Sequence, residues 1–150
     1  KMNHLRDIDF DKTAHNVDKL VRKKLPSLAL RCGSSLTELS SPKLSLAPSH
    51  TNRTDIQENM IVDSFGISKI VDAIHKTIFS CSDNSKIILV NYYLLNKTQE
   101  QVIMLLPYEK SQYYKALKPI ALVEFADRYD YWQCQCGVDP EDITDLHVYI

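Results

Sequence analysis

The sequence has only three glycines among its 150 residues. This scarcity argues against a glycine-rich loop that cradles nucleotide phosphates and against a turn-rich all-β fold. The chain also has no apolar run long enough to cross a membrane, and its start has no hydrophobic segment typical of a secretory signal. Hydrophobic residues make up 44% and charged residues 25%. We therefore expect a globular, cytoplasmic protein of one ordinary domain or a small domain with an appendage.

The spacing of the cysteines does not suit a metal site. The four cysteines are Cys32, Cys81, Cys134 and Cys136. A structural zinc site needs two close pairs of Cys or His, usually with Cys-x-x-Cys spacing, whereas Cys134 and Cys136 form a single Cys-x-Cys. His147 stands alone eleven residues later. We expect reduced, structural thiols, no metal ion and no other cofactor.

A catalytic set is likewise missing from the sequence. The five histidines fall in different segments, and we expect His75, beside Ile74, to be a partly exposed helix residue. The acids Asp139, Glu141 and Asp142 have the arrangement of helix-start charges rather than of a catalytic acid and base. A Cys-His nucleophilic pair stays open as an alternative, because sequence does not reveal spatial neighbours. We expect no enzymatic activity and assign no catalytic residues.

The net charge of −1 hides a gradient along the chain. Residues 1–53 carry ten basic and five acidic residues, residues 54–118 carry seven of each, and residues 119–150 carry one basic and seven acidic residues. Such asymmetry is consistent with polyanion binding by one part and a different role for the acidic end. An ordinary solvated surface is the simpler explanation.

Apolar spacing predicts a basic N-terminal helix over residues 11–32. Pro26 should kink or split this helix, and Gly33 should end it. The basic run 22–24 either touches phosphates or forms a solvated face, and the sequence does not decide between the two. The apolar residues at helical intervals are Val17, Leu20, Val21, Leu25, Leu28 and Leu30.

Residues 33–54 have a different composition, with six Ser, three Thr and two Pro. We interpret them as an extended linker that separates the N-terminal helix from the rest of the chain. Helical spacing then returns over residues 55–81, and a third helix is expected over 85–95, with Asn96 and Lys97 at its end. The apolar stripe of the 55–81 helix consists of Ile67, Ile70, Val71, Ile74 and Ile78.

The C-terminal residues are aromatic and acidic. Asp139 followed by Pro140 is a good signal for the start of one more short helix. Residues 147–150 have a short alternating pattern that suits an extended segment. We expect this tail either to pack on the domain or to serve as a contact surface.

Residues 98–117 read TQEQVIMLLPYEKSQYYKAL and predict two helices joined by a turn. Thr98 and Gln101 have capping-box spacing and should start a helix over 99–105. Residues 106–108 form the turn, and a second helix begins near Glu109. The residues expected to face inward are Val102, Ile103, Leu106, Tyr113 and Leu117.

The outer face of the second helix then carries polar groups that suit DNA. Gln112 can make bidentate bonds to adenine, Ser111 can bond base edges or phosphates, and lysines suit phosphates. A helix that presents such groups from its front end is what helix-turn-helix readout requires, although two amphipathic helices with a tight turn are also common in all-α proteins. The candidate DNA contacts are Thr98, Lys110, Ser111, Gln112, Tyr114, Lys115 and Lys118.

The order of these segments resembles the ArpU-like family of phage transcriptional regulators, found in temperate phages of Gram-positive bacteria. The resemblance runs from about residue 8 to residue 130 and covers the opening IDFDKTAHNVDKLVRKKL, the linker SSPKLSLAP, the mid helix and, most specifically, ILVNYYLLNKTQEQVIMLLPYEKSQYYKALKPIALVEFADRY. In that family the last part is similar to the fourth region of a sigma factor. A Tyr-Tyr pair stands near the front of its recognition helix and Glu-Phe-Ala near its end, here residues 113–114 and 124–126. The resemblance implies a regulator of late phage genes in a bacterial host cell, such as packaging, structural or lysis genes.

Three positions depart from the family pattern. Pro107 stands where the family turn usually has Gly, and proline cannot adopt positive φ, so the turn should be opened or reshaped. Glu109 replaces the usual Ser cap, and Glu is a weaker cap although its charge suits a helix N-terminus. Pro119 lies inside the second helix, removes a hydrogen bond to Lys115 and should kink the helix after Lys118.

From these patterns we predict a mostly α-helical protein with a sigma region-4-like helix-turn-helix domain. Its parts are an N-terminal basic segment (1–32), a Ser/Pro linker (33–54), the DNA-binding domain (55–130) and an acidic, aromatic tail (131–150). The expected function is sequence-specific regulation of transcription, as an activator that binds promoter DNA and contacts host RNA polymerase. A homodimer on repeated half-sites is expected because a single helix-turn-helix rarely gives enough affinity, and no membrane partner is expected.

Two other functions remain open. The first is a protein-interaction module that docks on RNA polymerase or a sigma factor without reading bases. The balanced charge of residues 54–118 favours this alternative, since most DNA readers have a clear basic excess. The second is a small helical assembly protein of the phage, which the Ser/Pro linker disfavours.

Overall fold

The computed structural model describes residues 6–43 and 58–150, with only the backbone described for 58–64. Within these ranges the chain is mostly α-helical, as predicted, and an isolated antiparallel bridge joins Ile8 to Tyr149. Elements labelled η are π-helical turns, except η6, which is a 3₁₀ turn. In chain order they are α1 (Phe10–Lys19), η2 (Leu20–Lys24), α2 (Leu25–Arg31), α3 (Leu36–Leu39), α4 (Glu58–Ser80), α5 (Asp83–Ile88), η4 (Leu89–Leu94), α6 (Gln99–Met104), α7 (Lys110–Gln112), η5 (Tyr113–Leu117), α8 (Lys118–Gln135) and η6 (Pro140–Asp142).

The predicted N-terminal helix is confirmed, because α1, η2 and α2 follow one another without a break. The Asp9 side chain accepts a hydrogen bond from the Lys12 N–H and caps the start of α1. Gly33 follows the last turn with φ of 81°, a value that glycine adopts at little cost. Pro26 does not split the helix as expected. It lies in the first turn of α2, directly after the π-helical segment η2.

The same arrangement occurs at Pro119, which lies in the first turn of α8 directly after η5. Proline has no N–H to donate to the carbonyl four residues earlier. In both segments the residue before the proline bonds five residues back, Leu25 to the Leu20 carbonyl and Lys118 to the Tyr113 carbonyl. The expected kink after Lys118 is therefore a π-helical turn, and the helix continues into α8.

The first part of the predicted linker is folded. Ser35 and Glu38 form a capping box in which the Ser35 N–H donates to Glu38 over 2.9 Å, and this box starts α3. Leu39 is buried, and the Ser41 carbonyl accepts a hydrogen bond from His75 Nε2 over 2.6 Å. The prediction of an extended chain is wrong for these residues, while residues 44–54 lie outside the described part.

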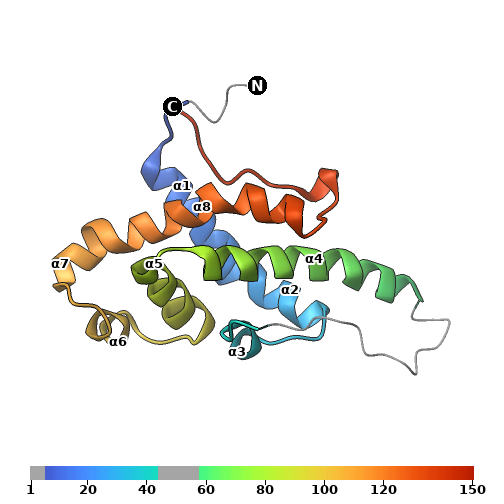
Figure 1. Ribbon diagram of the computed structural model, residues 1–150, viewed down its shortest axis with the longest axis horizontal. Coiled ribbons are helices and arrows are strands. Elements are labelled where there is room, and N and C mark those ends of the chain that lie inside the picture. Colours follow the sequence, from blue (N-terminus) through green and yellow to red (C-terminus); the bar gives the residue numbers. More distant parts are fainter. Residues whose placement is uncertain (1–5, 44–57) are drawn as a thin grey trace.

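One hydrophobic core includes residues from both ends of the chain. Figure 1 shows α4 and α8 running side by side, with α1 and α2 crossing them. Because α1 packs along α8 and α2 packs on α4, the N-terminal helix is not separated from the other helices in space. The core positions of the predicted stripe on α4 are confirmed, since Val71, Ile74 and Ile78 are fully buried.

The long helix α8 anchors several other segments. The Glu124 carboxylate accepts hydrogen bonds from the Ser82 N–H and hydroxyl, both over 2.8 Å, and so caps the start of α5. Trp132 donates from its indole N–H to the Ser80 hydroxyl over 3.0 Å. The Glu-Phe-Ala motif at 124–126 thus contributes a cap and two buried residues to the fold.

The C-terminal tail packs on α8 and α1, which is one of the two expected arrangements. The buried Gln133 amide exchanges two hydrogen bonds of 2.8 Å with the backbone of Thr144. Asn16 on α1 donates to the Leu146 carbonyl over 3.0 Å. The predicted short helix after Asp139 is a single 3₁₀ turn, η6. Figure 1 shows that these contacts bring the C-terminus close to the start of α1.

Candidate functional site

The first helix of the predicted pair, α6, begins with the expected capping box. The Thr98 hydroxyl accepts from the Gln101 N–H over 3.1 Å, and the Gln101 side chain accepts from the Thr98 N–H over 2.9 Å. Val102 is fully buried and the helix ends at Met104, within one residue of the predicted end. The sequence therefore predicts this helix well, because its start is determined locally.

The turn after α6 forms without any residue at positive φ. Three residues, 106–108, lie between the C-cap Leu105 and the N-cap Glu109. Neither Pro107 nor its neighbours are among the positive-φ residues of the described chain. Leu106 is buried and fixes the turn to the core. Glu109 has extended backbone and makes no side-chain cap hydrogen bond, as expected for a weak cap.

The second helix of the pair is formed by α7 and η5 and continues into α8. Tyr113 is fully buried, and its hydroxyl donates to the Gln99 side chain on α6, which ties the two helices together. Leu117 is partly buried against the core. The other side chains at the front of this helix are exposed around Tyr113. They are Lys110, Ser111, Gln112, Tyr114 and Lys115.

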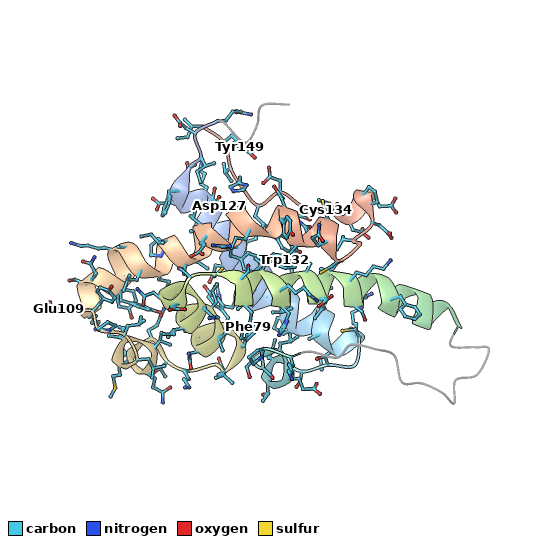
Figure 2. All side chains as sticks on the ribbon, viewed as in Figure 1. Phe79, Glu109, Asp127, Trp132, Cys134 and Tyr149 are labelled. Atoms are coloured by element: carbon cyan, nitrogen blue, oxygen red, sulfur yellow. The ribbon has the colours of Figure 1, made fainter. Side chains whose placement is uncertain are left out.

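Figure 2 shows Glu109, the start of this helix, at one end of the molecule, away from Phe79 and Trp132. Five of the seven candidate DNA contacts thus project from one end of one helix. Thr98 lies at the start of α6, the other helix of the pair. It is exposed, and its hydroxyl is engaged in the cap of α6.

Lys118 differs from the other candidates because it is partly buried. Its ammonium lies 4.4 Å from the centre of the Tyr92 ring. Burial lowers the pKa of Lys118, and the nearby charge of Asp18 opposes this effect. Lys118 therefore contributes to packing between η4 and the start of α8, in addition to any charge that it presents to solvent.

Asp18 on α1 is the centre of this junction. Its carboxylate accepts from the Tyr93 hydroxyl over 2.6 Å and from the Arg22 guanidinium over 2.8 and 3.0 Å. Burial alone would raise the pKa of Asp18, but the hydrogen bonds from Arg22 and Tyr93 and the charge of Lys118 outweigh it and hold the pKa below its usual value. Asp18 is therefore ionised at neutral pH and joins the N-terminal helix to η4, the segment that precedes the helix pair. The chain separation of 75 residues from Tyr93 hid this contact from sequence reasoning.

An exposed apolar cluster surrounds the turn and was missed by the sequence interpretation. Met104 is 84% exposed, and Leu105, Tyr108 and Tyr114 are each more than 40% exposed. The amphipathic pattern predicted the buried side of α6 but gave no sign that apolar residues would gather at the turn. Such residues can contact thymine methyl groups or a partner protein.

Among the described residues, the cysteine thiols that make hydrogen bonds, Cys32 and Cys81, bond backbone carbonyls rather than a histidine. Burial raises the pKa of Cys81 to about 12 and that of Cys136 to about 11, so these thiols stay protonated at neutral pH. His75 is 4% exposed, which corrects the expectation of partial exposure, and burial lowers its pKa. It lines an open groove of about 440 Å³ with Phe79 and Trp132. His4 and His50 lie outside the described residues.

His147 lies among carboxylates on α8 and the tail. Asp130, Asp145 and His147 each have one potential ligand atom within 4.8 Å of the others. Both ring nitrogens of His147 are engaged, Nδ1 with Asp145 over 2.6 Å and Nε2 with Asp127 over 2.8 Å. Two carboxylate partners require both nitrogens to donate, so the arrangement suits a protonated imidazole in an ion pair.

Comparison of the chain with protein-family models, curated proteins and solved structures finds no match of any kind. No helix in the described residues is both long and apolar enough to span a membrane.

Proposed function

We propose that the protein binds double-stranded promoter DNA and regulates transcription, with the front of α7 and η5 in the major groove. The observation that supports this proposal is the division of the second helix into two faces. Tyr113 is buried and bonded to α6, whereas Lys110, Ser111, Gln112, Tyr114 and Lys115 are exposed together. A helix-turn-helix reader needs this arrangement, because one face must hold the helix in the domain and the other must reach base edges.

The exposed side chains have complementary roles in this proposal. Gln112 makes bidentate bonds to adenine and is the main source of sequence preference. Lys110 and Lys115 contact backbone phosphates and position the helix, and Ser111 bonds a phosphate or a base edge. Tyr114 contacts a thymine methyl group or a phosphate.

The resemblance to the ArpU-like family supports a more specific proposal, namely activation of late phage genes with host RNA polymerase. Binding as a homodimer would supply the second half-site contact that a single helix-turn-helix needs. The protein would then act in the cytoplasm of the bacterial host.

The decisive experiment is a salt series of binding to promoter fragments from the native genome, with a scrambled duplex of equal length for comparison. We expect tight, sequence-dependent binding with a steep dependence of log Kd on log salt. Gln112→Ala should reduce discrimination between the two duplexes by about 1–3 kcal/mol. Lys115→Ala should weaken binding to both duplexes equally and lower the salt slope by about 1.

Gln135→Ala provides a matched control, because Gln135 is an exposed glutamine at the other end of the same helix. This variant should leave affinity, discrimination and slope unchanged. Weak and equal binding of the unaltered protein to both duplexes would rule out direct readout by this face.

The exposed apolar cluster favours a second candidate function, docking on RNA polymerase or a sigma factor without base readout. Met104 and Leu105 lie at the turn with 84% and 48% exposure. Under this alternative, Met104→Ser with Leu105→Ser abolishes function in a transcription assay, while Lys110→Glu with Lys115→Glu changes little. The DNA-binding proposal predicts that the lysine variant abolishes function.

A further inference from the structure

A second group of basic residues lies on the N-terminal helix, at the turn formed by η2. Lys19, Arg22 and Lys23 are all exposed, and Lys19 and Lys23 are four residues apart, so they lie on one face of the helix. Arg22 is paired with Asp18. Among the hydrogen bonds and ion pairs of the described residues, none engages the side chain of Lys19 or Lys23.

This group is joined to the second helix of the candidate site through Asp18. The Asp18 carboxylate binds Arg22 directly, and Lys118 lies close enough to interact with the charges of both Asp18 and Arg22. Lys118 also stacks on Tyr92, one residue before the Tyr93 that donates to Asp18. Lys118, which follows η5, therefore lies near Asp18 and Arg22, the residues that link the end of α1 to the turn η2.

Basic residues outnumber acidic ones on the two segments that meet at this junction. Lys115 is exposed and precedes Lys118 by three residues, so it lies about one helical turn away, on the side toward the front of the helix. Arg22 and Tyr93 bond the Asp18 carboxylate and the charge of Lys118 acts on it, while Lys19, Lys23 and Lys115 are exposed on the same two segments. The basic residues are Lys19, Arg22, Lys23, Lys115 and Lys118.

This arrangement changes the meaning of the charge balance along the chain. Residues 54–118 carry no net charge, which argues against DNA binding by the helix pair alone. Residues 1–53 carry ten basic residues against five acidic ones. The fold places part of that basic excess next to the helix that presents Gln112 and Lys115.

We propose that Lys19 and Lys23 on the N-terminal helix bind DNA backbone phosphates and, with Lys115, extend the contact of the helix pair along the duplex. The inference rests on the proposed function, because it assigns a second contact to the same DNA. Lysines that touch only phosphates add affinity and salt dependence without sequence preference. Asp18 pairs with Arg22 and accepts from Tyr93, so it fixes the turn η2 against η4.

The test compares two double variants that remove the same charge from different surfaces. Lys19→Ala with Lys23→Ala removes the proposed phosphate contacts, and Lys69→Ala with Lys76→Ala removes two exposed lysines of α4. All four side chains are exposed, so both variants should fold, and circular dichroism verifies this. Binding to the promoter fragment and to the scrambled duplex is measured over a salt series. The Lys19/Lys23 variant should lower the salt slope by about 2 and weaken binding to both duplexes equally.

Each outcome supports or overturns the inference. A slope that falls for the Lys19/Lys23 variant and not for the α4 variant supports it. If the unaltered protein binds the promoter selectively and the slope falls for neither variant, the N-terminal contact is wrong and the proposed function stands. Equal losses in both variants also overturn the contact, because they show a general effect of charge. If the unaltered protein binds neither duplex, the proposed function and the inference both fail.

Discussion

The two ends of the long helix that begins with α7 and finishes with α8 are held in different ways. At the rear, Gln133 and Trp132 bond the tail and the end of α4, and Tyr129 is buried. At the front, residues 110–112 bury no side chain, and Tyr113 is the first residue fixed in the core. Anchoring is therefore unequal along one helix. The rear is fixed by several partners, whereas the front is held mainly through Tyr113 and leaves its other side chains exposed.

The largest effect is expected at the front, where anchoring depends on few side chains. Tyr113→Ala should lower the free energy of unfolding by about 3–5 kcal/mol, because it empties a fully buried aromatic site and removes the hydrogen bond to Gln99. Chemical denaturation followed by circular dichroism measures this loss.

The neighbouring residue provides the control for this prediction. Tyr114 is 42% exposed, so Tyr114→Ala should change the free energy of unfolding by less than about 0.5 kcal/mol. Tyr113→Phe keeps the ring and should cost only about 0.5–1.5 kcal/mol for the lost hydrogen bond. Equal losses for Tyr113→Ala and Tyr114→Ala would show that the helix does not have the two faces described above.

An intermediate effect is expected at the rear. Gln133→Ala removes both side-chain partners of the Thr144 backbone, and it should lower the free energy of unfolding by about 1–3 kcal/mol. Amide hydrogen exchange should show the loss of protection in the tail rather than in α6 and α7. Gln135→Ala, two residues later and exposed, should leave both measurements unchanged. Loss of protection at α6 would mean that the two ends of the helix are coupled.

Local signals made the candidate site readable from the sequence. The capping box of Thr98 and Gln101 and the one-turn spacing of Tyr113 and Leu117 depend only on neighbours within about one turn of helix. The outward direction of Lys110, Ser111, Gln112, Tyr114 and Lys115 follows from those inward positions. The capping box of α3 is also present in the sequence, as Ser-x-x-Glu at 35–38, but the polar composition around it predicts a linker.

Other features depend on distant contacts and could not be read from the sequence. Asp18 has the pattern of an exposed helical acid, and only the fold brings Tyr93 and Lys118 to it. The prolines at 26 and 119 signalled a disturbed helix, but a kink, a break and a π-helical turn all relieve the missing hydrogen bond. Which of these three forms depends on how the helices pack, as α1 packs on α8, and packing cannot be inferred from local spacing.

The smallest effect concerns the middle of α8, where His147 joins the tail to Asp127. Burial alone would lower the pKa of His147, but its hydrogen bonds to Asp127 and Asp145 outweigh burial and raise the pKa above the usual value of about 6.5. A raised pKa in the folded state means that the folded protein binds the proton more tightly than the unfolded chain does. The stabilisation is therefore complete below about pH 6.5 and is lost as the pH rises through the raised pKa.

Comparison with His147→Gln over a range of pH tests this contact. The difference in free energy of unfolding between the two proteins should be largest in mildly acidic solution and should shrink as the solution becomes alkaline. The effect should be small, because the Asp127 side chain is 60% exposed and solvent screens the pair. His15→Gln is the control, since His15 is an exposed histidine of α1 that takes no part in the contact with Asp127. A difference that grows with pH would mean that His147 is held neutral, and the tail would then be attached to α8 by Gln133 and backbone contacts without the ion pair.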